Sequence, residues 1–160
     1  MALFKSKQIA AGRPAPSALN GSSAVVVVGE FLTVAGLTAA DVIEMVAFPA
    51  GTVPVDVTVV AEDLDTGTPA ITFDAGLLSG SFGDTGARTC GAEFLSDSNI
   101  GQAGGMARAA VPAGFLLGHS ASDRSLGIKI EAAAGTLATG KKIRMIATFA
   151  PVTAGLDATA

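Results

Sequence analysis

The stretch KIRMIATF, residues 142–149, alternates strictly between two sets of side chains. One set is apolar and the other is mostly polar or charged: Ile143, Met145, Ala147 and Phe149 against Lys142, Arg144, Ile146 and Thr148. Because successive side chains of a β-strand point to opposite faces, the stretch predicts a strand with one buried side. Half-buried strands of this kind are typical of antiparallel sheets.

The same alternation recurs in residues 55–62, 70–78 and 126–131. The positions expected to face the core are Val55, Val57, Val59, Ala61, Ile71, Phe73, Ala75, Leu77, Leu126, Ile128 and Ile130. Residues 25–34 are apolar more continuously, which predicts a strand covered on both faces. With 20 glycines and seven prolines between the apolar runs, about seven or eight short strands are expected. The sequence therefore predicts an all-β domain, an antiparallel β-sandwich or a jelly-roll-like barrel.

Turn residues separate the predicted strands at 49–51, 65–67, 83–86 and 139–140. Residues 38–41 have the spacing of a helix capping box, but the β-branched residues that follow and Pro49 favour a turn and then a strand. Residues 94–106 offer Ser96 as an N-cap. We expect at most one short helix there, at the edge of the sandwich.

The chain divides into an arm, residues 1–24, and a sandwich domain, residues 25–160. The segment GRPAPSALNGSS, residues 12–23, is rich in Pro, Gly, Ser and Asn, which favours an extended or irregular backbone. The arm carries Lys5, Lys7 and Arg13 and no acid. We expect an extended arm that orders on a partner.

Charge is sorted along the chain. Residues 14–87 contain no lysine or arginine but nine acids: Glu30, Asp41, Glu44, Asp56, Glu62, Asp63, Asp65, Asp74 and Asp84. If strands 55–62 and 70–78 are neighbours, Asp56, Glu62 and Asp74 gather on one face. Such a face predicts docking to a basic partner, and we take Lys5, Lys7, Arg13, Asp56 and Asp74 as candidate partner-binding residues. The alternative is that these acids are merely solvated surface.

Candidate chemistry in the sequence is sparse. His119 with Ser120, Ser122 and Asp123 has the residue types of a catalytic triad, but one short loop favours a polar turn. Residues 62–67, EDLDTG, resemble the start of a calcium loop, yet the glycine comes too early and a hairpin turn with an Asx cap fits better. Cys90, the single cysteine, fits a small buried apolar residue. We predict no enzymatic activity and neither cofactor nor metal.

Composition favours assembly. Apolar residues make up 49% of the chain and charged residues 15%, which leaves a monomer few ways to cover its surface. We therefore expect a homo-oligomer. Trp and Tyr are absent, which argues against sugar or nucleic-acid binding by ring stacking. The four-valine run at 25–28 is far too short to span a membrane, and no secretion signal is recognisable.

Four stretches resemble the small virion proteins of tailed bacteriophages, of the head decoration (cement) type. They are residues 25–45 (VVVVGEFLTVAGLTAADVIEM), 49–76 (PAGTVPVDVTVVAEDLDTGTPAITFDAG), 88–105 (RTCGAEFLSDSNIGQAGG) and 123–136 (DRSLGIKIEAAAGT). The resemblance implies a β-rich, non-enzymatic protein that binds the major capsid protein on the outside of the head, often as a trimer. It transfers no site residues. Two alternatives stay open: a tail-tube or tail-tip subunit, and a carbohydrate-binding or hydrolytic β-sandwich.

Overall fold

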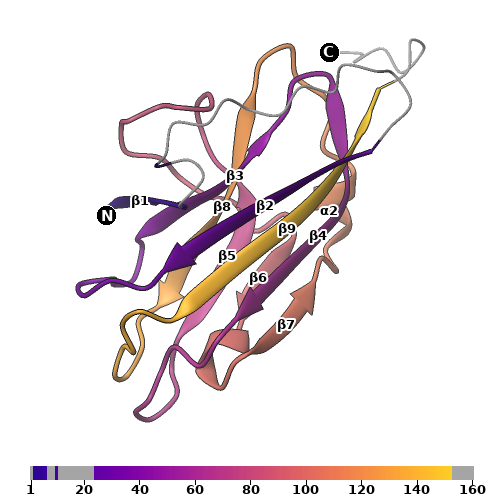
Figure 1. Cartoon of the computed structure of the whole chain (residues 1–160). Coiled ribbons are helices and arrows are strands. Elements are labelled where there is room, and N and C mark those ends of the chain that lie inside the picture. Colours follow the sequence, from indigo (N-terminus) through magenta and orange to yellow (C-terminus); the bar gives the residue numbers. More distant parts are fainter. Residues whose placement is uncertain (1, 7–9, 11–23, 153–160) are drawn as a thin grey trace.

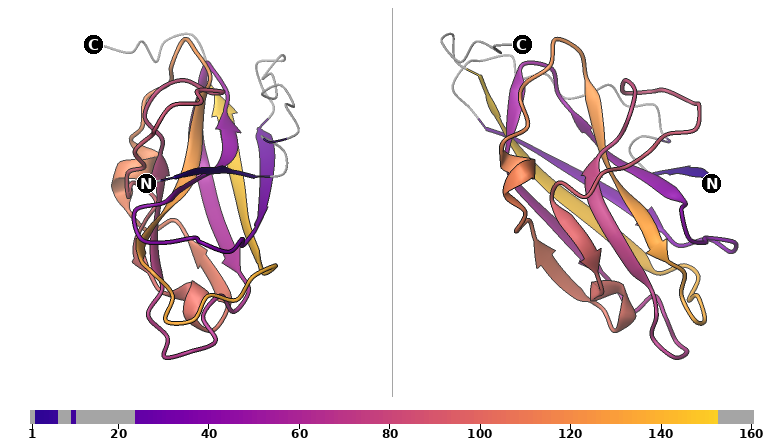
Figure 2. Two further views of the ribbon diagram at one scale, coloured as in Figure 1. Left: turned by 90° about the vertical axis from the view of Figure 1, so that its left-hand side faces the viewer. Right: turned by 180° about the vertical axis from the view of Figure 1, so that it is seen from behind.

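The computed structural model describes residues 2–6, 10 and 24–152 of the chain. The described elements are β1 (Leu3–Lys5), β2 (Val25–Leu32), β3 (Val42–Phe48), β4 (Thr52–Ala61), β5 (Thr72–Leu77), β6 (Leu95–Ser98), the 3₁₀ turn η1 (Ile100–Gln102), β7 (Gly105–Arg108), the single-turn helix α2 (Pro112–Phe115), β8 (Arg124–Ala132) and β9 (Lys142–Pro151). The strands form two sheets that pack face to face (Figures 1 and 2). The predicted all-β fold is confirmed, and of the two alternatives the sandwich is the one observed.

Sheet A has the strand order β1-β3-β8-β5-β6, and sheet B has the order β2-β9-β4-β7. All pairings are antiparallel except that of β1 with β3, which is parallel. β9 is central in sheet B, between β2 and β4 (Figure 1). Its alternation is confirmed, because Ile143, Met145, Ala147 and Phe149 are all fully buried.

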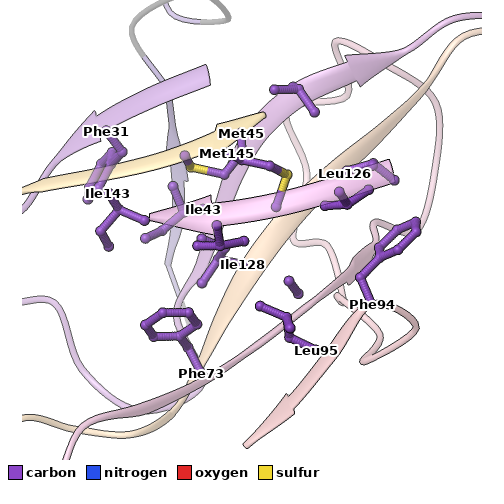
Figure 3. Packing of buried hydrophobic residues seen from close by; sticks show 14 of the residues in the cluster. Phe31, Ile43, Met45, Phe73, Phe94, Leu95, Leu126, Ile128, Ile143 and Met145 are labelled. Carbon is purple, nitrogen blue, oxygen red and sulfur yellow. The ribbon is translucent and has the colours of Figure 1, made fainter. Parts of the chain in front are cut away.

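The core lies between the two sheets. Sheet A contributes Ile43, Met45, Phe73 and Ile128, and sheet B contributes Phe31, Ile143 and Met145 (Figure 3). The rings of Phe48 and Phe149 stack across the interface with centroids 4.8 Å apart. Burial of these large side chains supplies most of the favourable free energy of folding.

Two strand predictions were wrong in detail. Val55 was assigned to the core side of its strand, but a β-bulge between Pro54 and Asp56 turns it outward and leaves it 50% exposed. Residues 25–34 were expected to be covered on both faces. Instead β2 is an edge strand whose residues alternate in burial, and Val26 and Val28 are exposed.

Within residues 94–106, where at most one short helix was expected, the chain forms β6, the 3₁₀ turn η1 and β7, so this expectation is met. The N-cap predicted at Ser96 is wrong, because Asn99 precedes the turn. The helix α2 begins later, at Pro112, whose ring suits the first helical position. The turn predicted at residues 38–41 is confirmed. Asp41 accepts hydrogen bonds from the amide and hydroxyl of Thr38, and β3 follows directly.

The boundary predicted at residue 24 does not separate an arm from a domain completely. Residues 3–5 form β1, which extends sheet A at its edge beside β3. Lys7 and Arg13, like most of the predicted arm, lie outside the described residues. That the arm orders on a partner stays a prediction.

Candidate functional site

The outer face of sheet B is the candidate assembly surface. The register of the four strands places the following side chains on it, away from the core: Val26, Val28, Glu30, Asp56, Thr58, Val60, Met106, Arg108, Lys142, Arg144, Ile146 and Thr148. Their neighbours along each strand, such as Phe31, Val57, Ala147 and Phe149, point into the core. We call this set the sheet B face.

Large apolar side chains are exposed on the sheet B face. Met106 is 69% exposed, Val26 59% and Val28 39%. Beside them, Val60, Glu62, Lys142 and Arg144 line a shallow hollow of about 170 Å³. Val26 and Val28 lie on the edge strand β2, and Met106 lies on the opposite edge strand β7. Exposed apolar side chains on one sheet face are typical of a surface that another protein covers.

Two ion pairs lie on this face: Arg144 donates to Glu30 at 2.6 Å, and Arg108 donates to Asp56 at 2.6 Å. At its edge, the Glu62 carboxylate accepts a hydrogen bond from the main-chain amide of Lys142 at 2.7 Å. The cations come from residues 88–160, which the topology brings beside the acidic segment. The face is therefore close to neutral, and each exposed pair contributes little to stability.

The acidic face expected from Asp56, Glu62 and Asp74 does not exist. β4 carries Asp56 in sheet B, while β5 carries Asp74 in sheet A, so the two strands are not neighbours. Asp74 is largely buried and accepts a hydrogen bond from the Asp97 amide at 2.8 Å. Burial raises its pKa, and the nearby Glu131 and Asp97 carboxylates raise it further. Whether Asp56 or Asp74 binds a partner stays a prediction.

The outer face of sheet A differs, because the chain covers part of it. Arg88, from the loop between β5 and β6, donates to the Glu44 carboxylate at 2.6 Å and to the Ser79 carbonyl at 2.6 Å. The Ser125 hydroxyl also donates to Glu44. All three interacting side chains are buried: Glu44, Arg88 and Ser125. The loop is thus fastened to the sheet by a buried ion pair.

The Glu44–Arg88 ion pair was not predicted from the sequence, although the sequence contains an indication of it. Glu44 is the one charged residue in VIEMVAF, residues 42–48, and a buried carboxylate requires a cation. Arg88 is the first cation after the acidic segment. Nothing in the sequence, however, shows that the loop folds back over β3.

The Asp65 turn is an anchoring structure. Its buried carboxylate accepts amide hydrogen bonds from Thr136, Ala70, Gly135 and Ile71, at 2.8–3.2 Å. These donors, that of Thr136 first, hold the pKa of Asp65 well below its usual range. The Asx turn is confirmed, because Asp63 accepts from the Asp65 amide. The hairpin is not, since the connection from β4 to β5 runs from one sheet to the other.

The remaining candidates show structural roles. Asp123 accepts a hydrogen bond from the Ala50 amide, and the Ser120 hydroxyl accepts from the Ser122 amide within the same loop. Cys90 is buried, as predicted, and burial raises its pKa to about 12. Within residues 2–6, 10 and 24–152, His, Cys, Asp and Glu form no group of three that could hold a metal ion. Among those same residues there is no helix long and apolar enough to cross a membrane.

Comparisons with known proteins give the class. No protein-family model and no curated protein sequence matches the chain. Among solved structures, it is 33% identical to a chain in the capsid of Ralstonia phage GP4, with a TM-score of 0.87 over 95% of this chain and 99% of that one. It is 25% identical to a chain in the capsid of cyanophage Pam1, with a TM-score of 0.64 over 87% and 93% of the two chains. A chain in the capsid of Helicobacter pylori bacteriophage KHP30, 17% identical with a TM-score of 0.53 over 83% and 92% of the two chains, shares the fold.

The chain therefore belongs to a family of bacteriophage capsid proteins, the one represented by the chain from phage GP4. As a member of that family it is a structural component of the phage virion, where it assembles with other capsid subunits. The resemblance to tailed-phage virion proteins is confirmed to this extent.

Proposed function

We propose that this protein is a decoration (cement) protein, which binds the outer surface of the phage head and stabilises the shell. The proposal rests on a difference between the two outer faces of the sandwich in how their apolar side chains are exposed. The sheet B face exposes Val26, Val28 and Met106, whereas a loop of the same chain covers part of the opposite face. A subunit that exposes apolar side chains on the sheet B face suits attachment to a shell through that face.

The partner in this proposal is the major capsid protein. Its contact with the sheet B face would bury the exposed valines and Met106, and this burial supplies the favourable free energy of binding. The paired charges around them then select orientation more than they add affinity. Lys5, Lys7, Arg13, Asp56 and Asp74 stay candidates for contacts with acidic or basic groups of the shell.

Stabilisation follows from mass action. A ligand that binds the assembled shell and not its separated subunits shifts the equilibrium toward the shell. We propose a homotrimer, since three linked copies at a local symmetry axis turn three weak contacts into one strong attachment. Sedimentation of the purified protein at micromolar concentration measures this state directly, and a stable monomer would limit trimer formation to the particle.

Location on the head is the testable core of the proposal. The chains that this protein resembles come from structures described as capsids, which favours the head over a tail-tube or tail-tip position. Intact virions carrying a tag at residue 160 can be labelled with gold and imaged. We expect label distributed over the whole head; label confined to the tail would refute the proposal.

A further inference from the structure

Strand β1 is held to the body by contacts made within residues 2–6. It pairs in parallel with β3, with Leu3, Phe4 and Lys5 opposite Val42, Ile43 and Glu44. Main-chain hydrogen bonds extend the pairing at both ends, from the Val42 amide to Ala2 and from the Ser6 amide to Glu44. The Asp41 carboxylate accepts the Ala2 amide at 2.7 Å.

The side chains of β1 fit complementary positions on the body. The Phe4 ring meets the Phe31 ring edge-on, with centroids 5.8 Å apart. Leu3 packs against the small cluster of Val42, Leu78 and Cys90. All three residues of β1 therefore have matching contacts on the sandwich: Leu3 and Phe4 pack against apolar side chains, and Lys5 lies beside an acidic one.

The Glu44 carboxylate has one oxygen whose charged partner is supplied by β1. Glu44 Oε2 is buried and, among the described residues, accepts no hydrogen bond; its ion-pair partner is the Lys5 ammonium, 4.0 Å away. Arg88 and Ser125 bond to the other oxygen, Oε1. An unsatisfied buried carboxylate oxygen is costly, so the free edge of β3 is suited to a strand that carries a cation beside Glu44.

The segment between β1 and β2 is long enough for β1 to pair with β3 of its own chain or with β3 of a neighbouring copy. Residues 7–24 link β1 to β2 and would span roughly 60 Å at full extension. The contacts of residues 2–6 are the same whether the strand comes from the same chain or from an identical neighbour. Exchange of an identical element between copies is a low-cost route to assembly, and pairing of an added strand at a sheet edge is a common recognition mode.

We propose that in the assembled state the segment Ala2–Ser6 of one copy pairs with β3 of a neighbouring copy of this chain. Its Lys5 then pairs with the neighbour's Glu44, and its Phe4 contacts the neighbour's Phe31. The proposal rests on the assembly of several copies side by side, as in the proposed function. Such an exchange links neighbouring copies through the same contacts that β1 and β3 make within a single chain.

Disulfide trapping tests the exchange. The variant Leu3→Cys/Val42→Cys, in a Cys90→Ala background, places two cysteines at register partners of adjacent strands, about 4.8 Å apart. The full-length protein is oxidised both in purified form and on virions, and then separated on a non-reducing denaturing gel. We expect covalent dimers and higher species of this chain. The control Thr72→Cys/Ala132→Cys, register partners on β5 and β8 of sheet A, should give a bridged monomer.

Each outcome is decisive. Covalent oligomers from the Leu3/Val42 variant, with monomers from the control, establish the exchange. A bridged monomer in both preparations shows that each chain binds its own strand, and overturns the proposal. Absence of any bridge in the Leu3/Val42 variant, while the control does bridge, shows that residue 3 does not lie beside residue 42, and this also overturns it. Gold labelling tests head location separately, so either proposal can fail alone.

Discussion

Glu44 and Arg88 connect two parts of the chain that the sequence keeps far apart. Both side chains are buried, and their ion pair fastens the loop after β5 to the middle of β3. Taking two charges out of water is expensive, so a pair of this kind adds little net stability over apolar side chains. Its importance lies in what happens when one partner is removed.

Substitution of Arg88 by Met should destabilise the protein by about 3–5 kcal/mol, because it leaves the Glu44 carboxylate buried without its main partner. Each kcal/mol lowers the melting temperature by about 2–4 °C in a chain of this length. The double variant Glu44→Leu/Arg88→Met should recover most of that loss. Calorimetry on the wild type, both single variants and the double variant completes the cycle; equal losses in single and double variants would contradict the account.

Asp65 predicts a specific pH dependence. Its pKa is lowered in the folded state by amide donors, that of Thr136 first, so its contribution is complete above the unfolded pKa of about 3.9 and is lost as pH falls below it. Asp65→Asn should therefore melt below the wild type at pH 6, and the difference should shrink between pH 4 and pH 2. A difference independent of pH would show that the carboxylate charge is unimportant.

At the scale of the elements, alternation of apolar residues predicted most strands correctly. Period-two patterns located β4, β5, β8 and β9, because burial of one sheet face is encoded residue by residue. The pattern failed at Val55, where a bulge shifts the register, and at β2, where a run of valines concealed an edge strand. Sequence periodicity does not show bulges or strand order, because both depend on which strands pair.

The order of strands in the two sheets also determines which charged residues share a face of the candidate site. The acidic residues of β4 and β5 were expected on one face, but these strands belong to different sheets, and cations from β7 and β9 pair with the acids of sheet B. Long-range pairing of this kind cannot be deduced from local charge. The exposed valines of β2 were visible in the sequence, yet their outward direction became clear from the register with β9.

Gly29 of β2 in sheet B packs tightly against β3 of sheet A. A Cβ atom there would lie 2.1 Å from the carbonyl oxygen of Met45 in β3, a main-chain atom that cannot move aside easily. Gly29→Ala should therefore destabilise the fold by about 1–3 kcal/mol through overpacking. The matched control is Gly86→Ala, where a Cβ meets nothing within 4 Å. Chemical denaturation measures both; equal stability of the two variants would contradict the packing described.

At the scale of the whole molecule, the proposed function predicts that a partner covers the sheet B face, where Val26 and Met106 are exposed. Val26→Lys and Met106→Lys should leave the melting temperature nearly unchanged, since both side chains are mostly exposed. They should weaken binding to the particle at least tenfold, because a lysine would be forced into an apolar contact. The control is Leu116→Lys, an 82% exposed residue just after α2, which should bind normally. Normal binding of the sheet B variants would exclude that face.

The central claim is that this protein stabilises the phage shell from outside. Particles made without it can be saturated with the purified protein and heated in the presence of a dye that reports DNA release. We predict that the protein binds the intact head and that DNA release shifts to a higher temperature in proportion to occupancy. Failure to bind intact heads, or an unchanged release temperature at full occupancy, would contradict the claim.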